Sequence, residues 1–168
     1  MNTRLELSGK FVVEHRDQHG NLKKTYTFKN GVTNGGLNDM LDAAFGNGTQ
    51  RTEWYLGLLD DGPTLAAADT MASHAGWTEN VDYDEANRPT WLGSDVAASQ
   101  AITNASYVVF TMSLSAGVTI AGIFISSDNT KGGTSGILWA TGLFNEGDVA
   151  TEYGDTLNVT YTINAAAA

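Results

Sequence analysis

The sequence predicts a mainly β fold, an antiparallel β-sandwich or jelly-roll-like domain with one short α-helix and an N-terminal β-hairpin arm. Three observations support this prediction. Eight or more short segments are rich in β-branched and aromatic residues or alternate between apolar and polar residues. The 19 glycines favour the tight turns that join such strands. Only one segment has a strong helical period, and nothing alternates as strand, helix and strand would in a parallel sheet.

The length of 168 residues suits one domain that buries a sizeable core. The chain has no cysteine, which excludes disulfides, a thiolate metal site and a thiol nucleophile. Charged residues follow Met1 closely, where a secretory signal would have its apolar segment, and no run approaches about 18 apolar residues. We therefore expect a protein made in the cytoplasm that has no membrane partner.

Residues 1–30 are expected to form the hairpin arm. The strand segments are residues 5–7, 11–16 and 22–29, and residues 17–21 supply the turn. In the last segment Tyr26 and Phe28 alternate with threonines and Lys29, so that one face is apolar and the other polar. An apolar face on a ribbon of this kind has to lie against something.

A helix is expected at residues 34–45, at the start of the body that residues 31–164 form. Thr33 or Asn34 can cap its first turn, and Gly46 can end it. The spacing of its apolar residues places them on one face. They are Leu37, Met40, Leu41, Ala44 and Phe45. This stripe predicts a helix that closes over the β core.

The remaining strands follow from composition and period. Residues 54–59 and 118–125 are apolar almost throughout, as in strands covered on both faces, and residues 107–112 and 157–163 also read as strands. Residues 65–74 form either a short helix or a covering loop, and the alanines at 165–168 are expected to fray. The predicted core comprises Leu37, Met40, Leu41, Phe45, Trp54, Leu56, Phe110, Ile123, Leu157, Val159 and Tyr161.

The net charge of −10 is distributed unevenly. Residues 1–30 hold six of the nine basic residues and three acids, a balance of +3, whereas the remainder carries −13. An acidic body disfavours a nucleic-acid partner, because phosphates would be repelled. Either the hairpin meets an acidic protein surface or it is a solvated ribbon with scattered lysines. Under the first reading the candidate contact residues are Lys10, Arg16, Lys23, Lys24, Tyr26, Phe28 and Lys29.

Enzyme motifs are absent from the sequence. Residues 133–136 lack the spacing of a nucleophile elbow, and there is neither a P-loop nor a zinc-protease motif. His15 and His19 lie by the hairpin turn, and His74 suits a structural role. The acidic loops lack the ligand spacing of a calcium site. We therefore predict no catalytic residues, no cofactor and no metal.

The four tryptophans leave two readings open. Trp54, Trp77, Trp91 and Trp139 either line a surface that stacks against sugars or belong to the core or a subunit interface. The second reading is the more common one for aromatic residues in a β domain without disulfides.

Several word-like stretches carry a resemblance that covers residues 9–163. They are DQHGNLK at 17–23, NGVTNGGLN at 30–38, GTQ at 48–50, WYLGL at 54–58, ASHAGW at 72–77, NRPTW at 87–91, KGGT at 131–134 and GDTLNVTY at 154–161. In these stretches the chain resembles a group of small structural proteins of tailed bacteriophages.

The resemblance implies a non-enzymatic virion protein, a capsid decoration or cement protein with a β-rich fold. Such proteins often sit as trimers on the outer capsid surface, so the implied partners are the major capsid protein and further copies of the chain. The resemblance supplies no catalytic residues. The alternative is a tail or fibre component that contacts the host surface, with the tryptophans as a carbohydrate-binding patch.

Overall fold

A computed structural model describes residues 5–60, 62–93, 97 and 99–167. Within them, eleven strands form one open antiparallel sheet, accompanied by one helix. The strands are β1 (Leu5–Arg16), β2 (Leu22–Val32), β3 (Trp54–Asp60), β4 (Glu79–Asn80), β5 (Thr90–Trp91), β6 (Ala101–Thr103), β7 (Val108–Thr111), β8 (Val118–Ser126), β9 (Leu138–Leu143), β10 (Val149–Thr151) and β11 (Thr156–Ala167), and the helix is α1 (Asn34–Phe45). The expected mainly β, sandwich-like fold with one helix is confirmed.

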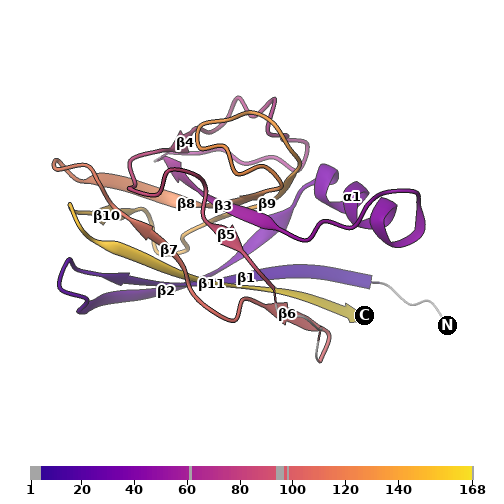
Figure 1. The fold of residues 1–168 in the computed structure, drawn as a ribbon, viewed down its shortest axis with the longest axis horizontal. Helices are drawn as coiled ribbons and strands as arrows, with labels where there is room; N and C mark the ends of the chain where they lie inside the picture. Colours follow the sequence, from indigo (N-terminus) through magenta and orange to yellow (C-terminus); the bar gives the residue numbers. More distant parts are fainter. Residues whose placement is uncertain (1–4, 61, 94–96, 98, 168) are drawn as a thin grey trace.

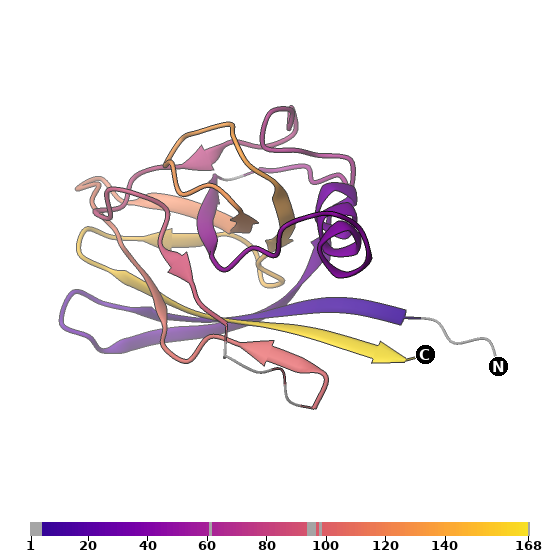
Figure 2. The same ribbon diagram turned by 45° about the vertical axis from the view of Figure 1, so that its right-hand side comes forward.

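The sheet folds back on itself into two layers (Figures 1 and 2). The lower layer contains β1, β2 and β11, with β6 and β7 beside β11, and the upper layer is built around β3, β8 and β9. β2 belongs to both layers, because its residues up to Asn30 pair with β1 and its end, Gly31 and Val32, pairs with β9. The crossing point is therefore at Asn30 and Gly31.

The main core lies between the layers and is rich in aromatic rings. Phe11 of β1 stacks on Phe28 of β2 at 5.0 Å and on Tyr161 of β11 at 4.5 Å between ring centroids. All three side chains are almost completely buried. Strict alternation along β1 and β11 points one residue in two towards this core, so the period predicted for residues 157–163 matches the structure.

A second, smaller core lies on the other face of the upper layer. It contains Leu59 of β3, Phe124 of β8 and Leu138 of β9, covered by Met71 and Trp77. Residues 65–74 contain no helix and serve as the covering loop. This second cluster explains why β3 and β8 are apolar on both faces.

The N-terminal hairpin forms, but it is not a separate unit. β1 pairs with β11 along its whole length, from Leu5 with Ala167 to Arg16 with Thr156. The hairpin expected at residues 1–30 is therefore continuous with the body in one sheet, and its apolar face is covered by its own domain. The expected fraying at 165–168 was wrong for residues 165–167, which belong to β11; residue 168 lies outside the described residues.

Helix α1 has the expected bounds but not the expected burial. The Thr33 hydroxyl caps it by accepting the Gly36 N–H at 3.0 Å. Gly36 is its buried residue, and a Cβ there would lie 2.5 Å from the carbonyl oxygen of Trp139. The helix thus approaches the sheet through its first turn and then projects beyond it (Figure 1).

Three members of the predicted core are consequently on the surface. Leu37, Leu41 and Phe45 are 37%, 50% and 87% exposed. Of the helix stripe, Met40 is partly buried against the main core, as is Trp54 of β3. The other predicted core residues are buried: Leu56, Phe110, Ile123, Leu157, Val159 and Tyr161.

Candidate functional site

Three of the candidate basic residues form ion pairs inside the chain. The Arg16 guanidinium lies 2.6 Å from Glu14, and the Lys24 ammonium lies 2.6 Å from Glu146. The Lys23 ammonium donates to Asp155 and to Glu152, both at 2.9 Å. The hydrogen bond to Asp155, followed by that to Glu152, raises the pKa of Lys23. Each of these side chains therefore already has a partner within its own chain. Their contact with a partner surface stays a prediction.

The two aromatic candidates also face inwards. Phe28 is 1% exposed in the main core. Tyr26 is half-buried and meets the edge of the Phe144 ring at a centroid distance of 5.1 Å. Both were predicted to need a cover, and their own domain provides it.

Lys10 and Lys29 remain available for an external contact. They lie directly opposite each other on β1 and β2, and both are exposed. Among the described residues, neither ammonium group lies within ion-pair distance of a carboxylate. Two like charges directly across an antiparallel pair are destabilising. The fold therefore carries an uncompensated positive pair at this position.

The surface around this pair is the face of the lower layer that points away from the core. We call it the outer face, and its side chains alternate with the buried ones of β1, β2 and β11. It comprises Lys10, Val12, Thr25, Thr27, Lys29, Asn158, Thr160 and Thr162. At its far end Glu14 is neutralised by Arg16 and accepts a hydrogen bond from Tyr107. The two lysines are thus a pair of positive charges on a broad polar surface, and the alternation along β1 places the exposed Glu6 on the same face nearer the start of the strand.

The residues suspected of chemistry occupy structural positions. His15 lies 2.7 Å from Asp155, and His74 stacks on Trp77 with its Nδ1 3.0 Å from the Trp77 carbonyl oxygen. No group of three or more His, Asp or Glu side chains among the described residues is placed to hold a metal. Nor does the part of the chain described here contain a helix long and apolar enough to cross a membrane.

The tryptophans do not form a surface for sugars. Trp77, Trp91 and Trp139 are buried, and Trp54 is half-buried against Trp139 at 5.5 Å between ring centroids. The Trp91 indole donates to the Tyr161 carbonyl at 3.1 Å, which satisfies its N–H inside the core. Of the two readings left open by the sequence, the structure supports the core.

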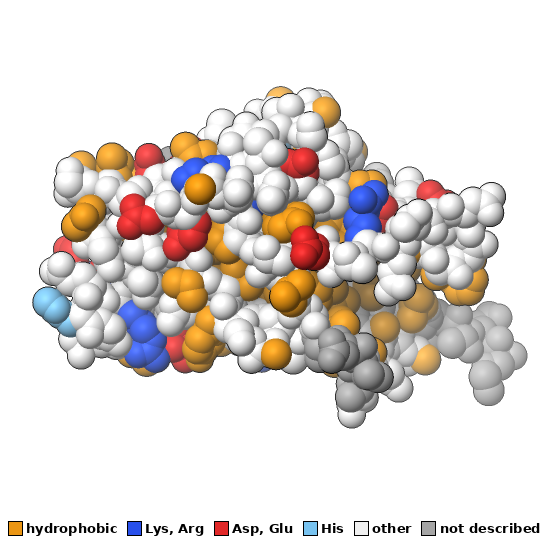
Figure 3. All heavy atoms as spheres, viewed as in Figure 1, with side chains coloured by type: hydrophobic (Ala, Val, Ile, Leu, Met, Phe, Trp, Pro, Cys, Tyr) orange, Lys and Arg blue, Asp and Glu red, His pale blue; other side chains and the backbone are white. Residues whose placement is uncertain are grey.

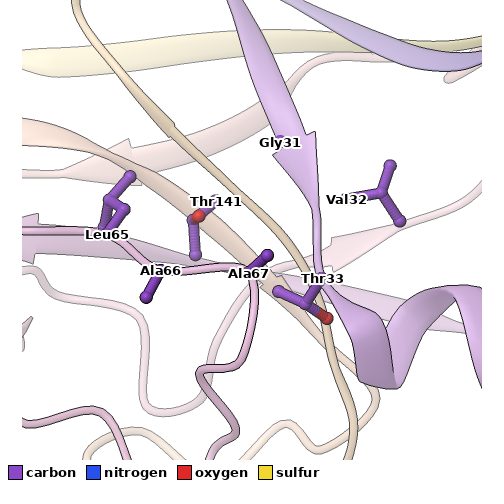
Figure 4. Close-up of a pocket in the computed structure, with 7 residues that line it drawn as sticks. All are labelled: Gly31, Val32, Thr33, Leu65, Ala66, Ala67 and Thr141. Carbon is purple, nitrogen blue, oxygen red and sulfur yellow. The ribbon is translucent and has the colours of Figure 1, made fainter.

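Described residues line at least two hollows on the surface. One of about 170 Å³ lies where β2 enters α1 and is lined by Gly31, Val32, Thr33, Leu65, Ala66, Ala67 and Thr141 (Figure 4). We call it the β2–α1 hollow. The other, of about 280 Å³, has a mostly polar lining of Thr49, Gln50, Arg51, Thr52, Glu53, Tyr55 and Ser127. The sequence offered only a faint signal of the first, the small residues that follow Leu65.

The sequence was compared with protein-family models and with curated proteins. None of the protein-family models compared with the sequence matches it, and no curated protein is similar enough to count as related.

Proposed function

We propose that this chain is a non-enzymatic structural protein of a tailed-bacteriophage virion, a decoration protein that binds the outer capsid surface and stabilises the shell. The resemblance of several word-like stretches to those of phage structural proteins motivates the proposal. The β-sandwich supports it, because it is the fold which that resemblance implies. The major capsid protein is the proposed partner, and the proposed form is a homo-oligomer, with a trimer favoured.

The observation that carries the proposal is the unpaired couple of Lys10 and Lys29 on the outer face. Repulsion between the two ammonium groups costs stability in the free protein. A carboxylate of a partner placed between them would relieve that repulsion and gain an interaction with both. The rest of the molecule is acidic, and Figure 3 shows carboxylates scattered over the upper layer, so the outer face suits an acidic protein surface.

A decoration protein does not need a large contact. A specific interface buries about 1,000 Å² or more, and an oligomer that engages several sites at once multiplies the effect of each. Binding to the assembled shell and not to its dissociated subunits then stabilises the shell by mass action.

The test uses capsids that lack the protein and measures binding of the purified full-length chain by co-sedimentation. The double variant Lys10→Gln/Lys29→Gln should lose at least about tenfold in affinity, equivalent to about 1.4 kcal/mol. It should fold at least as stably as the unchanged protein, because the repulsion is gone. Lys24→Gln is the matched control, since that lysine already has Glu146 as its partner. Binding of the unchanged protein should weaken as salt rises.

The same experiment separates the alternatives. Full binding by the double variant would refute the outer face as the docking surface. Labelled protein found on tails and absent from shells would refute decoration and favour the tail component. No exposed cluster of tryptophans supports carbohydrate binding, since three of the four are buried and Trp54 is half-buried.

A further inference from the structure

Phe45 is an unusually exposed aromatic residue. It is the last residue of α1 and is 87% exposed, while Leu41, one turn earlier, is 50% exposed. Figure 3 shows apolar side chains gathered along the lower side of the projecting helix. A phenylalanine buries about 150–250 Å² when covered, so leaving this one in water forgoes a large hydrophobic gain. The position at the tip of a projecting element makes Phe45 accessible to another molecule.

The β2–α1 hollow is a receptor of matching size and chemistry. Its volume of about 170 Å³ is similar to that of an enclosed engineered cavity of about 150 Å³ that binds benzene, but this hollow is open to solvent on one side. The side chains of Leu65, Ala66 and Ala67 give it an apolar wall, and Figure 4 shows Thr141 beside Leu65. All seven lining residues are uncharged. A phenyl ring placed in the hollow would therefore meet no charged residue in its lining.

Phe45 cannot fill the hollow of its own molecule. The hollow includes Thr33, the N-cap of α1, and Phe45 lies at the other end of that helix. Twelve helical residues span about 18 Å at about 1.5 Å per residue, well beyond the reach of a phenylalanine side chain. The Phe45 ring and the hollow are both apolar and belong to the same chain. The length of α1 keeps them apart within one molecule.

We propose that the Phe45 side chain of one copy inserts into the β2–α1 hollow of a second copy. The contact is heterologous, because a different patch is used on each molecule, so it closes into a ring or extends into a filament. The lining of the hollow is uncharged, which limits repulsion between copies that each carry a charge of −10, although Asp42 lies one turn before Phe45 and Asp69 accepts a hydrogen bond from the Ala66 amide. Asp39 on α1 is itself neutralised by Arg51 at 2.9 Å. This inference does not depend on the proposed capsid role.

The test needs two variants of the full-length chain, each lacking one half of the contact. Phe45→Ser removes the inserted ring, and Ala67→Trp fills the hollow. Both positions are exposed, so at concentrations low enough for the unchanged protein to be monomeric both variants should keep its circular dichroism spectrum and melting temperature. Tyr153→Ser is the matched control, because Tyr153 is also an exposed aromatic residue, at 61%. Sedimentation velocity over a range of concentrations reports the association.

The unchanged protein should self-associate, the control should match it, and each variant alone should associate at least about tenfold more weakly. An equimolar mixture of the two variants should form one-to-one pairs and nothing larger, because the Phe45 ring of the Ala67→Trp copy enters the open hollow of the Phe45→Ser copy. An unchanged protein that stays monomeric would overturn the proposal.

Two further results would also refute it. If Ala67→Trp associates normally, the hollow is not the receptor. If the mixture contains only pairs of the Ala67→Trp variant, the helices pack face to face instead. The failure of this inference is distinguishable from failure of the decoration role, because neither variant changes Lys10 or Lys29 and no capsid is present.

Discussion

The His15 imidazole and the Asp155 carboxylate lie 2.7 Å apart, and both side chains are buried. Their contact ties β1 to the turn that precedes β11. Asp155 also accepts hydrogen bonds from the Lys23 ammonium and the Glu152 amide, both at 2.9 Å. Burial by itself would raise the pKa of Asp155, but the hydrogen bonds from Lys23, His15 and the Glu152 amide together hold it below its ordinary value.

The lowered pKa of Asp155 predicts acid sensitivity. Because the folded state favours the carboxylate, its stabilisation is fully present above the ordinary pKa of 3.8 and is lost as the pH falls through the lower folded-state value. Asp155→Asn should cost about 3 kcal/mol near neutral pH, and the difference from the unchanged protein should shrink towards about pH 2. Urea unfolding measured across this range tests the prediction.

The neighbouring Glu152 provides the control for this experiment. It pairs with the same lysine, but its side chain is 79% exposed. Glu152→Gln should therefore change the free energy of unfolding by less than about 1 kcal/mol. A difference between Asp155→Asn and the unchanged protein that does not vary with pH would contradict the assignment.

Gly57 of β3 is required by the ring opposite it. A Cβ at this position would lie 2.2 Å from Cζ of Phe124, and that ring is held by Trp77 and by the Arg88 guanidinium 5.1 Å away. Gly57→Ala should destabilise the fold by about 1–3 kcal/mol. Gly31→Ala, where a Cβ would meet nothing within 4 Å, should stay within about 0.5 kcal/mol. Equal effects of the two substitutions in thermal melts would disprove this packing argument.

The buried Arg88 side chain holds the loop between β8 and β9 in place through hydrogen bonds. It donates to both carboxylate oxygens of Glu79, at 2.9 and 2.7 Å, and to the carbonyl oxygens of Asp128 and Gly133. Arg88→Gln should cost about 3–5 kcal/mol, because Glu79 is left buried without its counter-charge. Hydrogen exchange of residues 127–136 should accelerate. Arg51→Gln, which breaks an exposed pair with Asp39, should cost less than about 1 kcal/mol and leave that exchange unchanged.

The exposure of α1 predicts an unequal response to truncating two leucines. Leu56→Ala in β3 should cost about 2–5 kcal/mol, because that side chain is completely buried. Leu41→Ala in α1 should stay within about 0.5 kcal/mol for the isolated chain, since the side chain is half exposed. Denaturant unfolding of both variants at low protein concentration is the measurement. A large loss for Leu41→Ala would mean that the helix packs closely on the sheet.

Period and composition were sufficient to locate most elements but not to say what covers them. The stripe from Leu37 to Phe45 predicted a helix with the correct bounds. Burial of that stripe depends on the direction in which α1 leaves the sheet, and the helix approaches the sheet closely at Gly36, beside Trp139. No local pattern contains that information, because the two residues are far apart in the sequence.

Counting charges likewise could not show which lysines are paired within the chain. Counting predicted a basic hairpin beside an acidic body, and this composition is real. Lys23, however, is paired with Asp155, 132 residues away, which only the folding of the chain reveals. Within the part of the chain that the structure describes, Lys10 and Lys29 form no such ion pair. Their register places them opposite each other on the outer face, so that each has another lysine as its cross-strand neighbour.

The long pairing of β1 with β11 has a consequence for the order in which the protein is built. His15 and Asp155, at one end of this pairing, are separated by 140 residues. During synthesis, β1 emerges from the ribosome early and has β2 on one side, but its other side has no neighbour until β11 has been made. Closing so distant a pair is entropically costly and slow. The half-built lower layer therefore exposes an open strand edge for most of the time that translation takes, and a chaperone that binds such edges has its best opportunity then.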